Sequence, residues 1–85
     1  MNPHIIVLVH VTDRIRKAGE VQKIFTEFGC NIKTRIGLHE VSEKVCRPSG
    51  VIVLEIFGRE KDADKLVRRL RSVKGVEAKK VVFGH

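Results

Sequence analysis

The 85-residue sequence predicts one α+β domain whose four strands and two helices follow the order βαββαβ. Three observations lead to this prediction. Two stretches carry apolar residues at helical spacing, which indicates amphipathic helices. Two others are short, continuous apolar runs, typical of strands buried on both faces, and a further stretch alternates between polar and apolar residues, as a half-exposed strand does.

The first half of the chain contains a strand, a helix and a second strand. Residues 4–11 (HIIVLVHV) are β-branched and apolar, and the run is too short for a typical helix, so we expect a buried strand. From Ile15 to Phe28 the apolar residues recur every three or four positions, which predicts a helix. Residues 31–38 (NIKTRIGL) predict an alternating strand. We expect one face of this strand to carry Ile32, Thr34, Ile36 and Leu38, and the other face to carry Lys33 and Arg35.

The second half has the same organisation. Residues 39–50 are polar and end in Pro-Ser-Gly, so we expect this segment to contain a loop. Residues 51–57 (VIVLEIF) predict a buried strand, residues 63–73 a second helix and residues 76–83 a last strand. Right-handed crossovers then place both helices on one face of a four-stranded antiparallel sheet, the ferredoxin-like arrangement. We expect residues 1–85 to form this single domain.

The sheet face without helices is expected to be apolar. In the first and third strands, which are the central pair of this fold, both alternating sets of side chains are mainly apolar. A large exposed apolar patch usually marks an interaction site, so we expect self-association into a dimer or tetramer by sheet-to-sheet or edge-to-edge contact. The alternative is that these residues are simply β-formers on a tolerant surface. The expected interface residues are Ile6, Leu8, Val51, Val53 and Phe57.

The net charge of +7 raises the question of an anionic partner, such as a nucleic acid or an acidic protein. The alternative is a solvated basic surface, because acidic residues are interspersed among the Lys and Arg residues. Recognition of RNA on a ferredoxin-like sheet usually uses aromatic stacking platforms. The chain has four Phe and neither Tyr nor Trp, which argues against nucleic acid as the partner.

The two cysteines, Cys30 and Cys46, read as thiols in a reducing compartment, because no secretory leader is apparent. We expect a cytoplasmic protein, since the N-terminal apolar run is far too short to span a membrane. Cys30 is expected to be a small buried hydrophobe.

No strong catalytic motif is present: the chain lacks a phosphate-binding Gly-rich loop, a Cys-x-x-Cys pair and a Gly-x-Ser-x-Gly turn. We therefore expect neither an enzyme nor a bound cofactor. His39 and Cys46 form the best pair of metal ligands, because imidazole and thiolate suit zinc, nickel or copper. A metal-responsive regulatory domain is thus one alternative, and a surface histidine with an ordinary loop cysteine is the other.

The segments NIKTRIGLHEVSEKVCRPSGVIVLEIFG and LRSVKGVEAKKVVF resemble the small ACT-like proteins known as proposed regulators of iron-only hydrogenase systems. The likeness lies in the RIGLHE run at residues 35–40 and in a Gly-Val-x-x-Lys segment before the last strand. The chain departs from the family in its longer, cysteine-bearing loop at residues 41–49. The resemblance implies a regulatory domain that binds a small effector between copies. The effector-binding residues that it implies are Thr12, Asp13, Thr34, Arg35 and Gly37.

Overall fold

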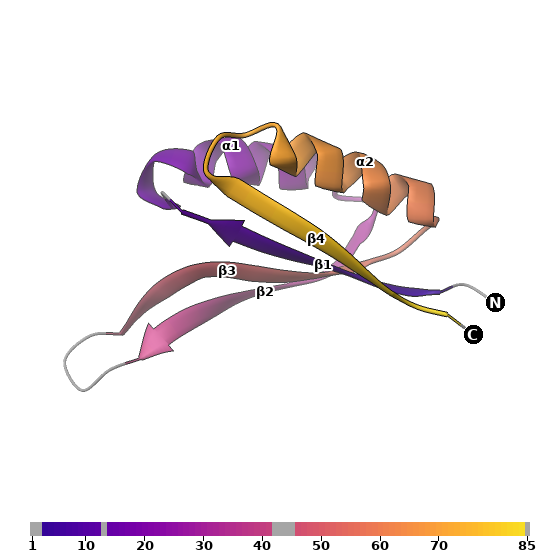
Figure 1. The fold of residues 1–85 in the computed structure, drawn as a ribbon, viewed down its shortest axis with the longest axis horizontal. Helices are drawn as coiled ribbons and strands as arrows, with labels where there is room; N and C mark the ends of the chain where they lie inside the picture. Colours follow the sequence, from indigo (N-terminus) through magenta and orange to yellow (C-terminus); the bar gives the residue numbers. More distant parts are fainter. Residues whose placement is uncertain (1–2, 13, 42–45, 85) are drawn as a thin grey trace.

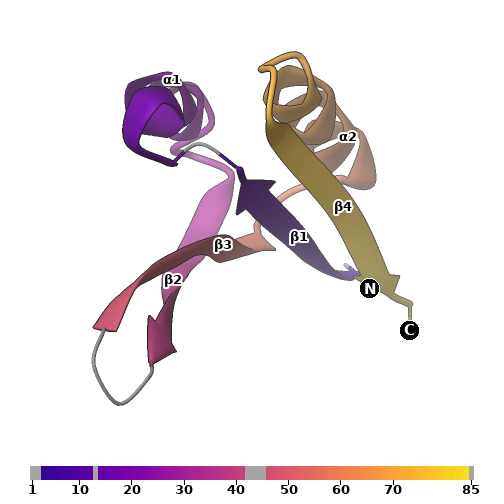
Figure 2. The ribbon, with the colours of Figure 1, turned by 60° about the vertical axis from the view of Figure 1, so that its left-hand side comes forward.

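The computed structural model describes residues 3–12, 14–41 and 46–84 of the chain. The strands form one antiparallel sheet in the order β2-β3-β1-β4. Both helices lie on the same side of this sheet (Figures 1 and 2). This architecture confirms the predicted α+β, ferredoxin-like fold. The elements are β1 (His4–Val11), α1 (Arg14–Glu27), β2 (Ile32–Val41), β3 (Cys46–Ile56), α2 (Glu60–Arg71) and β4 (Val76–Phe83).

The hydrophobic core lies between the helices and one face of the sheet. Strand alternation sends every second residue of β1 and β3 into this core. The helices contribute the apolar stripes that the sequence predicts, with Val21, Ile24 and Phe25 from α1 and Leu66 and Leu70 among those from α2. Packing of both helices on one side leaves the opposite sheet face uncovered. The largest fully buried side chains are Ile5, Val7, Val9, Leu54, Leu66 and Leu70.

The hairpin formed by β2 and β3 is longer than the sequence predicts. The sequence predicts strands over residues 31–38 and 51–57 with a loop within residues 39–50, whereas β2 continues to Val41 and β3 begins at Cys46. The register pairs His39 with Pro48 and Val41 with Cys46. Polar composition indicated a loop here, whereas a hairpin arm that projects beyond the rest of the sheet (Figure 1) can be polar and still form a ladder of backbone hydrogen bonds.

The predicted alternation of β2 holds from Thr34 to Ile36, but Ile32 lies on the opposite face from the one predicted for it. Ile32 pairs with Ile56 and packs against the core, but the register shifts before Thr34, which pairs with Glu55. An irregularity of this kind adds a residue to one strand and reverses the faces of the residues that follow. As a result, Ile36 lies on the open face of the sheet and Arg35 on the helix side, the reverse of simple alternation from Ile32.

Cys30 is exposed, which corrects the expectation that it is buried. It lies in the short turn between α1 and β2. Its neighbours Phe28 and Ile32 pack against the core from either side of this turn. The main chain of the turn is held by a hydrogen bond in which the Asn31 N–H donates to the Phe28 carbonyl (2.8 Å). The general preference of free cysteine for burial is thus overridden by two larger apolar neighbours.

Gly50 in β3 occupies a position that no other residue can adopt without strain. Its φ is +86°, and an added Cβ would lie 2.6 Å from the main-chain oxygen of Val11. We expect Gly50→Ala to lower the free energy of unfolding by about 1–3 kcal/mol, because the backbone conformation and the contact with a main-chain atom are both unfavourable. Urea unfolding followed by circular dichroism measures this loss.

Gly37→Ala in β2 is the matched control. An added Cβ there meets nothing within 4 Å, and Gly37 is not among the glycines with positive φ. We expect its free energy of unfolding to stay within about 0.5 kcal/mol of the unsubstituted protein. Equal losses in the two variants would contradict the assignment of strain to Gly50.

Candidate functional site

The open face of the sheet carries a continuous apolar patch. The register aligns its outward side chains into rows across the strands, and Ile36, Val53 and Leu8 form one such row. Ile36 is 51% exposed and Leu8 38% exposed, whereas Val53 between them is half-buried. At one end of the sheet Phe57 is 63% exposed. We term this surface the open-face patch, and its members are Ile6, Leu8, Ile36, Val51, Val53, Phe57, Val81 and Phe83.

All five residues predicted as an oligomer interface lie on this face, and their role in assembly stays a prediction. Sequence reasoning missed three members of the patch. The sequence does not predict that Ile36 lies beside Val53, because the register shift in β2 moves Ile36 to the open face. Val81 and Phe83 could have been found, since β4 buries Val76 and Ala78 and alternation then turns the odd-numbered residues outward.

Charged groups stand inside and beside the patch. Glu55 of β3 has a side chain only 32% exposed. The Thr34 hydroxyl donates a hydrogen bond to its carboxylate (3.3 Å), and the Lys33 Nζ lies 3.8 Å from it. Lys79 of β4 is the cross-strand partner of Leu8, and within the described part of the chain its ammonium group has no ion pair. The Glu55 carboxylate in the patch therefore has partners within its own chain, whereas the Lys79 ammonium group has no ion pair among the described residues.

Arg35 lies on the other side of the sheet, against α1. Its Nη1 donates a hydrogen bond to the Gln22 Oε1 (2.9 Å), and its guanidinium carbon lies 5.3 Å from the centre of the Phe25 ring. A cation held over an aromatic face is stabilised electrostatically, so this guanidinium is held in place before any ligand arrives. Lys33 and Arg35 line an open cleft of about 290 Å³ at this point, which could accommodate a small anion.

The effector-binding residues implied by the family resemblance do not converge within one chain. Thr34 lies on the open face and Arg35 on the helix side. Thr12 follows β1, where its backbone N–H donates to the Gly75 carbonyl (2.8 Å). Gly37 pairs with Ile52, two strands away from β1, so roughly 10 Å separates it from the line of β1. Asp13 lies outside the described residues.

The predicted metal ligands His39 and Cys46 are described only as backbone positions in the hairpin. Cys46 pairs with Val41 and His39 with Pro48, so the two positions are two residues apart along neighbouring strands. Their side chains lie outside the described part of the structure. Among the side chains that are described, no three His, Cys, Asp or Glu residues gather where they could hold a metal ion. Metal binding at His39 and Cys46 stays a prediction.

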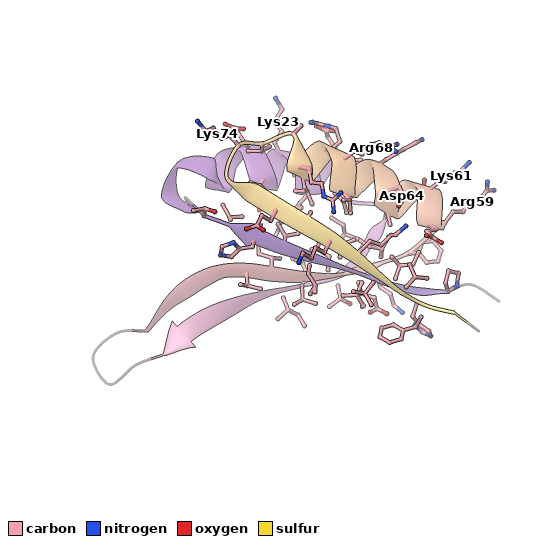
Figure 3. The ribbon with its side chains drawn as sticks, in the orientation of Figure 1. Lys23, Arg59, Lys61, Asp64, Arg68 and Lys74 are labelled. Atoms are coloured by element: carbon pink, nitrogen blue, oxygen red, sulfur yellow. The ribbon has the colours of Figure 1, made fainter. Side chains whose placement is uncertain are left out.

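The helix layer has the opposite character to the open face, because its outer side is strongly charged. Figure 3 shows Lys23, Arg59, Lys61, Arg68 and Lys74 reaching away from the sheet. Neither described helix is long and apolar enough to cross a membrane. This charged side of the domain is well solvated, so burial against a partner favours the apolar open-face patch instead.

Ion pairs fasten the helices to each other and to the sheet. The Arg69 guanidinium donates hydrogen bonds to Glu27 of α1, which lowers the pKa of that carboxyl. Lys80 of β4 lies 2.5 Å from carboxylate oxygens of Asp64 and Glu60 in α2, and these hydrogen bonds raise its pKa. These pairs position α2 over β4 without using any group of the open face.

No family model and no curated protein matches the sequence. Among solved structures, the chain is similar to the uncharacterized protein TM1266 from Thermotoga maritima, with a TM-score of 0.69 and 23% identity over 98% of both chains. It is also similar to CPII, a nitrogen regulatory PII-like protein from Thiomonas intermedia K12 bound to ADP, AMP and bicarbonate (TM-score 0.51, 10% identity, 96% of both chains).

A third structure with the same fold is a candidate monooxygenase from Shewanella loihica, with a TM-score of 0.50, 14% identity, and coverage of 99% of this chain and 94% of that one. These likenesses show the fold alone. Because proteins described as regulatory and as catalytic share it, the fold does not decide between these roles, and a role other than catalysis stays our prediction.

Proposed function

We propose that this chain is a non-enzymatic regulatory domain that associates with copies of itself through the open-face patch, as a dimer or a tetramer. The patch is the observation that carries the proposal. Leu8, Ile36 and Phe57 are 38%, 51% and 63% exposed, on one continuous surface. Burying one such side chain fully contributes about 1.5–3 kcal/mol, and a contiguous patch of this kind commonly marks an interface.

A second copy of the chain can cover the open-face patch without any other protein. Closed two-fold dimers are the commonest soluble assemblies, and they bury the same patch on both subunits. The charged helix layers then face water on the two outer sides of the dimer. Association through the patch would thus remove the apolar surface from water while leaving every helix exposed as it is in the single chain.

The regulatory role draws its support from two likenesses and from the chemistry of the chain. The fold resembles that of a nitrogen regulatory PII-like protein bound to nucleotides, and the sequence resembles ACT-like regulators of iron-only hydrogenase systems. We place a small effector between copies, at the positions of Thr12, Asp13, Thr34, Arg35 and Gly37. A site shared between copies suits these residues, because one chain holds Thr34 and Arg35 on opposite faces of its sheet.

Sedimentation equilibrium over a range from low to high micromolar concentration tests the proposal. We expect a mass of at least two chains at high micromolar concentration, with dissociation on dilution. A thermal-shift screen of amino acids and adenine nucleotides then tests for the effector, and stabilisation should depend on Arg35. A strictly monomeric mass at high micromolar concentration would overturn self-association.

A further inference from the structure

Two charged residues of the open face occupy diagonal corners of a rectangle centred on β1. Glu55 of β3 is the cross-strand partner of Ile6, and Lys79 of β4 is the partner of Leu8. The other two corners are Val53, which also pairs with Leu8, and Val81, which also pairs with Ile6. The centre of the rectangle therefore lies on β1, midway between Ile6 and Leu8.

These two charges do not pair with each other within one chain. Neighbouring strands are about 4.8 Å apart and residues on one face about 6.7 Å apart, so roughly 12 Å separates the Glu55 and Lys79 positions. The Glu55 carboxylate already accepts a hydrogen bond from Thr34 and has the Lys33 ammonium 3.8 Å away, but a carboxylate can accept about four hydrogen bonds. The Lys79 ammonium has three donors and no ion pair among the described residues.

We propose that two copies of this chain meet sheet to sheet about a two-fold axis that crosses β1 between Ile6 and Leu8, so that Glu55 of each copy pairs with Lys79 of the other. This inference rests on the proposed self-association and specifies its geometry. The axis lies in the plane of the interface, at right angles to the line that joins Glu55 and Lys79. Rotation about it brings Glu55 of one copy over Lys79 of the other, and Lys79 over Glu55. One axis therefore creates two identical ion pairs on either side of an apolar centre.

The alternative alignments through the same centre leave Lys79 unpaired, and they leave Glu55 with only Lys33 of its own chain. An axis parallel to β1 would set Glu55 against Val81 of the second copy and Lys79 against Val53. An axis perpendicular to β1 would set Glu55 against Val53 and Lys79 against Val81. Either arrangement buries the Lys79 ammonium group against valine without a counter-charge, and an uncompensated buried charge is strongly unfavourable. Only the diagonal axis satisfies the charge pattern.

The diagonal axis is also compatible with known sheet packing. From the same spacings, it makes the strands of the two sheets cross at roughly 70°, closer to the orthogonal class of sheet packing (about 90°) than to the aligned class (about 30°). Ile6 and Leu8 then meet their own copies at the centre. The ion pairs stand beside this centre, where they select the orientation of the two copies more than they add affinity.

Charge reversal tests the pairing in the full chain. We expect Glu55→Lys and Lys79→Glu each to raise the dimer dissociation constant by at least about tenfold at low salt, because each places two like-charge contacts in the interface. The double variant, with both reversals, should return to within about threefold of the unsubstituted protein. Lys23→Glu on the helix layer is the control for net charge and should leave the constant unchanged.

Sedimentation velocity gives the constants, and circular dichroism checks that every variant is folded. Lys79 is exposed at an edge strand, so Lys79→Glu keeps the test valid even if Glu55→Lys fails to fold. If the single reversals leave the dissociation constant unchanged, or if the double variant does not restore it, the Glu55–Lys79 pairing is wrong while self-association still holds. A protein that is monomeric without substitutions would overturn both.

Discussion

Leu54→Ala is expected to lower the free energy of unfolding by about 2–5 kcal/mol, the range for a large side chain removed from a packed core. Leu54 is fully buried and lies in the central strand β3, opposite Val7 of β1. The methyl groups that it loses leave a cavity that the flanking strands cannot close. A domain of this size has a total stability of only about 5–15 kcal/mol, so the loss is a large fraction of it.

Thermal unfolding and urea titration measure the effect. We expect the midpoint of thermal unfolding to fall by at least about 8 °C, since 1 kcal/mol corresponds to roughly 4–8 °C in a domain of this length. The loss should not depend on protein concentration, because Leu54 faces the helices rather than a partner.

Leu8→Ala is the matched control, because Leu8 lies on the adjacent strand with its side chain on the opposite face. We expect its effect to be smaller at low protein concentration and to grow as the concentration rises, since the self-associated form is the one that buries Leu8. Equal, concentration-independent losses in the two variants would mean that Leu8 belongs to the core of the single chain.

The element order and the two faces of the central strands could be predicted because their signals are local. Ile5, Val7 and Val9 alternate with Ile6 and Leu8, and such alternation places one set in the core and the other outside whatever the partner strand does. The helical stripe from Ala63 to Leu70 is equally local. Each of these features depends only on the periodicity of the chain itself.

The alternation of Thr34, Arg35 and Ile36 could be predicted, but not their faces relative to Ile32, because these depend on pairing with β3. The register shift between Ile32 and Thr34 exchanges the faces of the residues that follow, and no residue type at that point indicates it. The length of the β2–β3 hairpin was not predicted, for a related reason. Its polar residues are typical of a loop, but pairing with a neighbouring strand satisfies their backbone groups.

The candidate site was accessible to sequence reasoning in part. An apolar outer face follows from β1 and β3, and alternation along β4 extends it to Val81 and Phe83, but its extension to Ile36 needs the register of β2. The diagonal relation of Glu55 and Lys79 also arises only from that register, because the residues are 24 positions apart in the printed sequence (79 less 55). Charge complementarity of this kind is a property of the assembled sheet.

Leu8→Lys is expected to raise the dissociation constant of the self-associated form by about two to three orders of magnitude. Leu8 lies at the centre of the open-face patch, so assembly would bury a second ammonium group beside Lys79 with no counter-charge of its own, at a cost of about 3–5 kcal/mol. Each 1.4 kcal/mol corresponds to tenfold in affinity. Its cross-strand partner is Lys79, and two like charges in directly opposite positions repel each other further.

The single chain should survive this substitution. Leu8 is 38% exposed, and a lysine there can lay its methylene groups on the patch while its ammonium group reaches water. Thr26→Lys adds the same charge at an exposed position of α1 and is expected to leave the dissociation constant unchanged. Sedimentation equilibrium compares the two variants. If Leu8→Lys assembles as tightly as Thr26→Lys, the copies meet at the edges of β2 or β4 instead, because these are the two strands with an unpaired side.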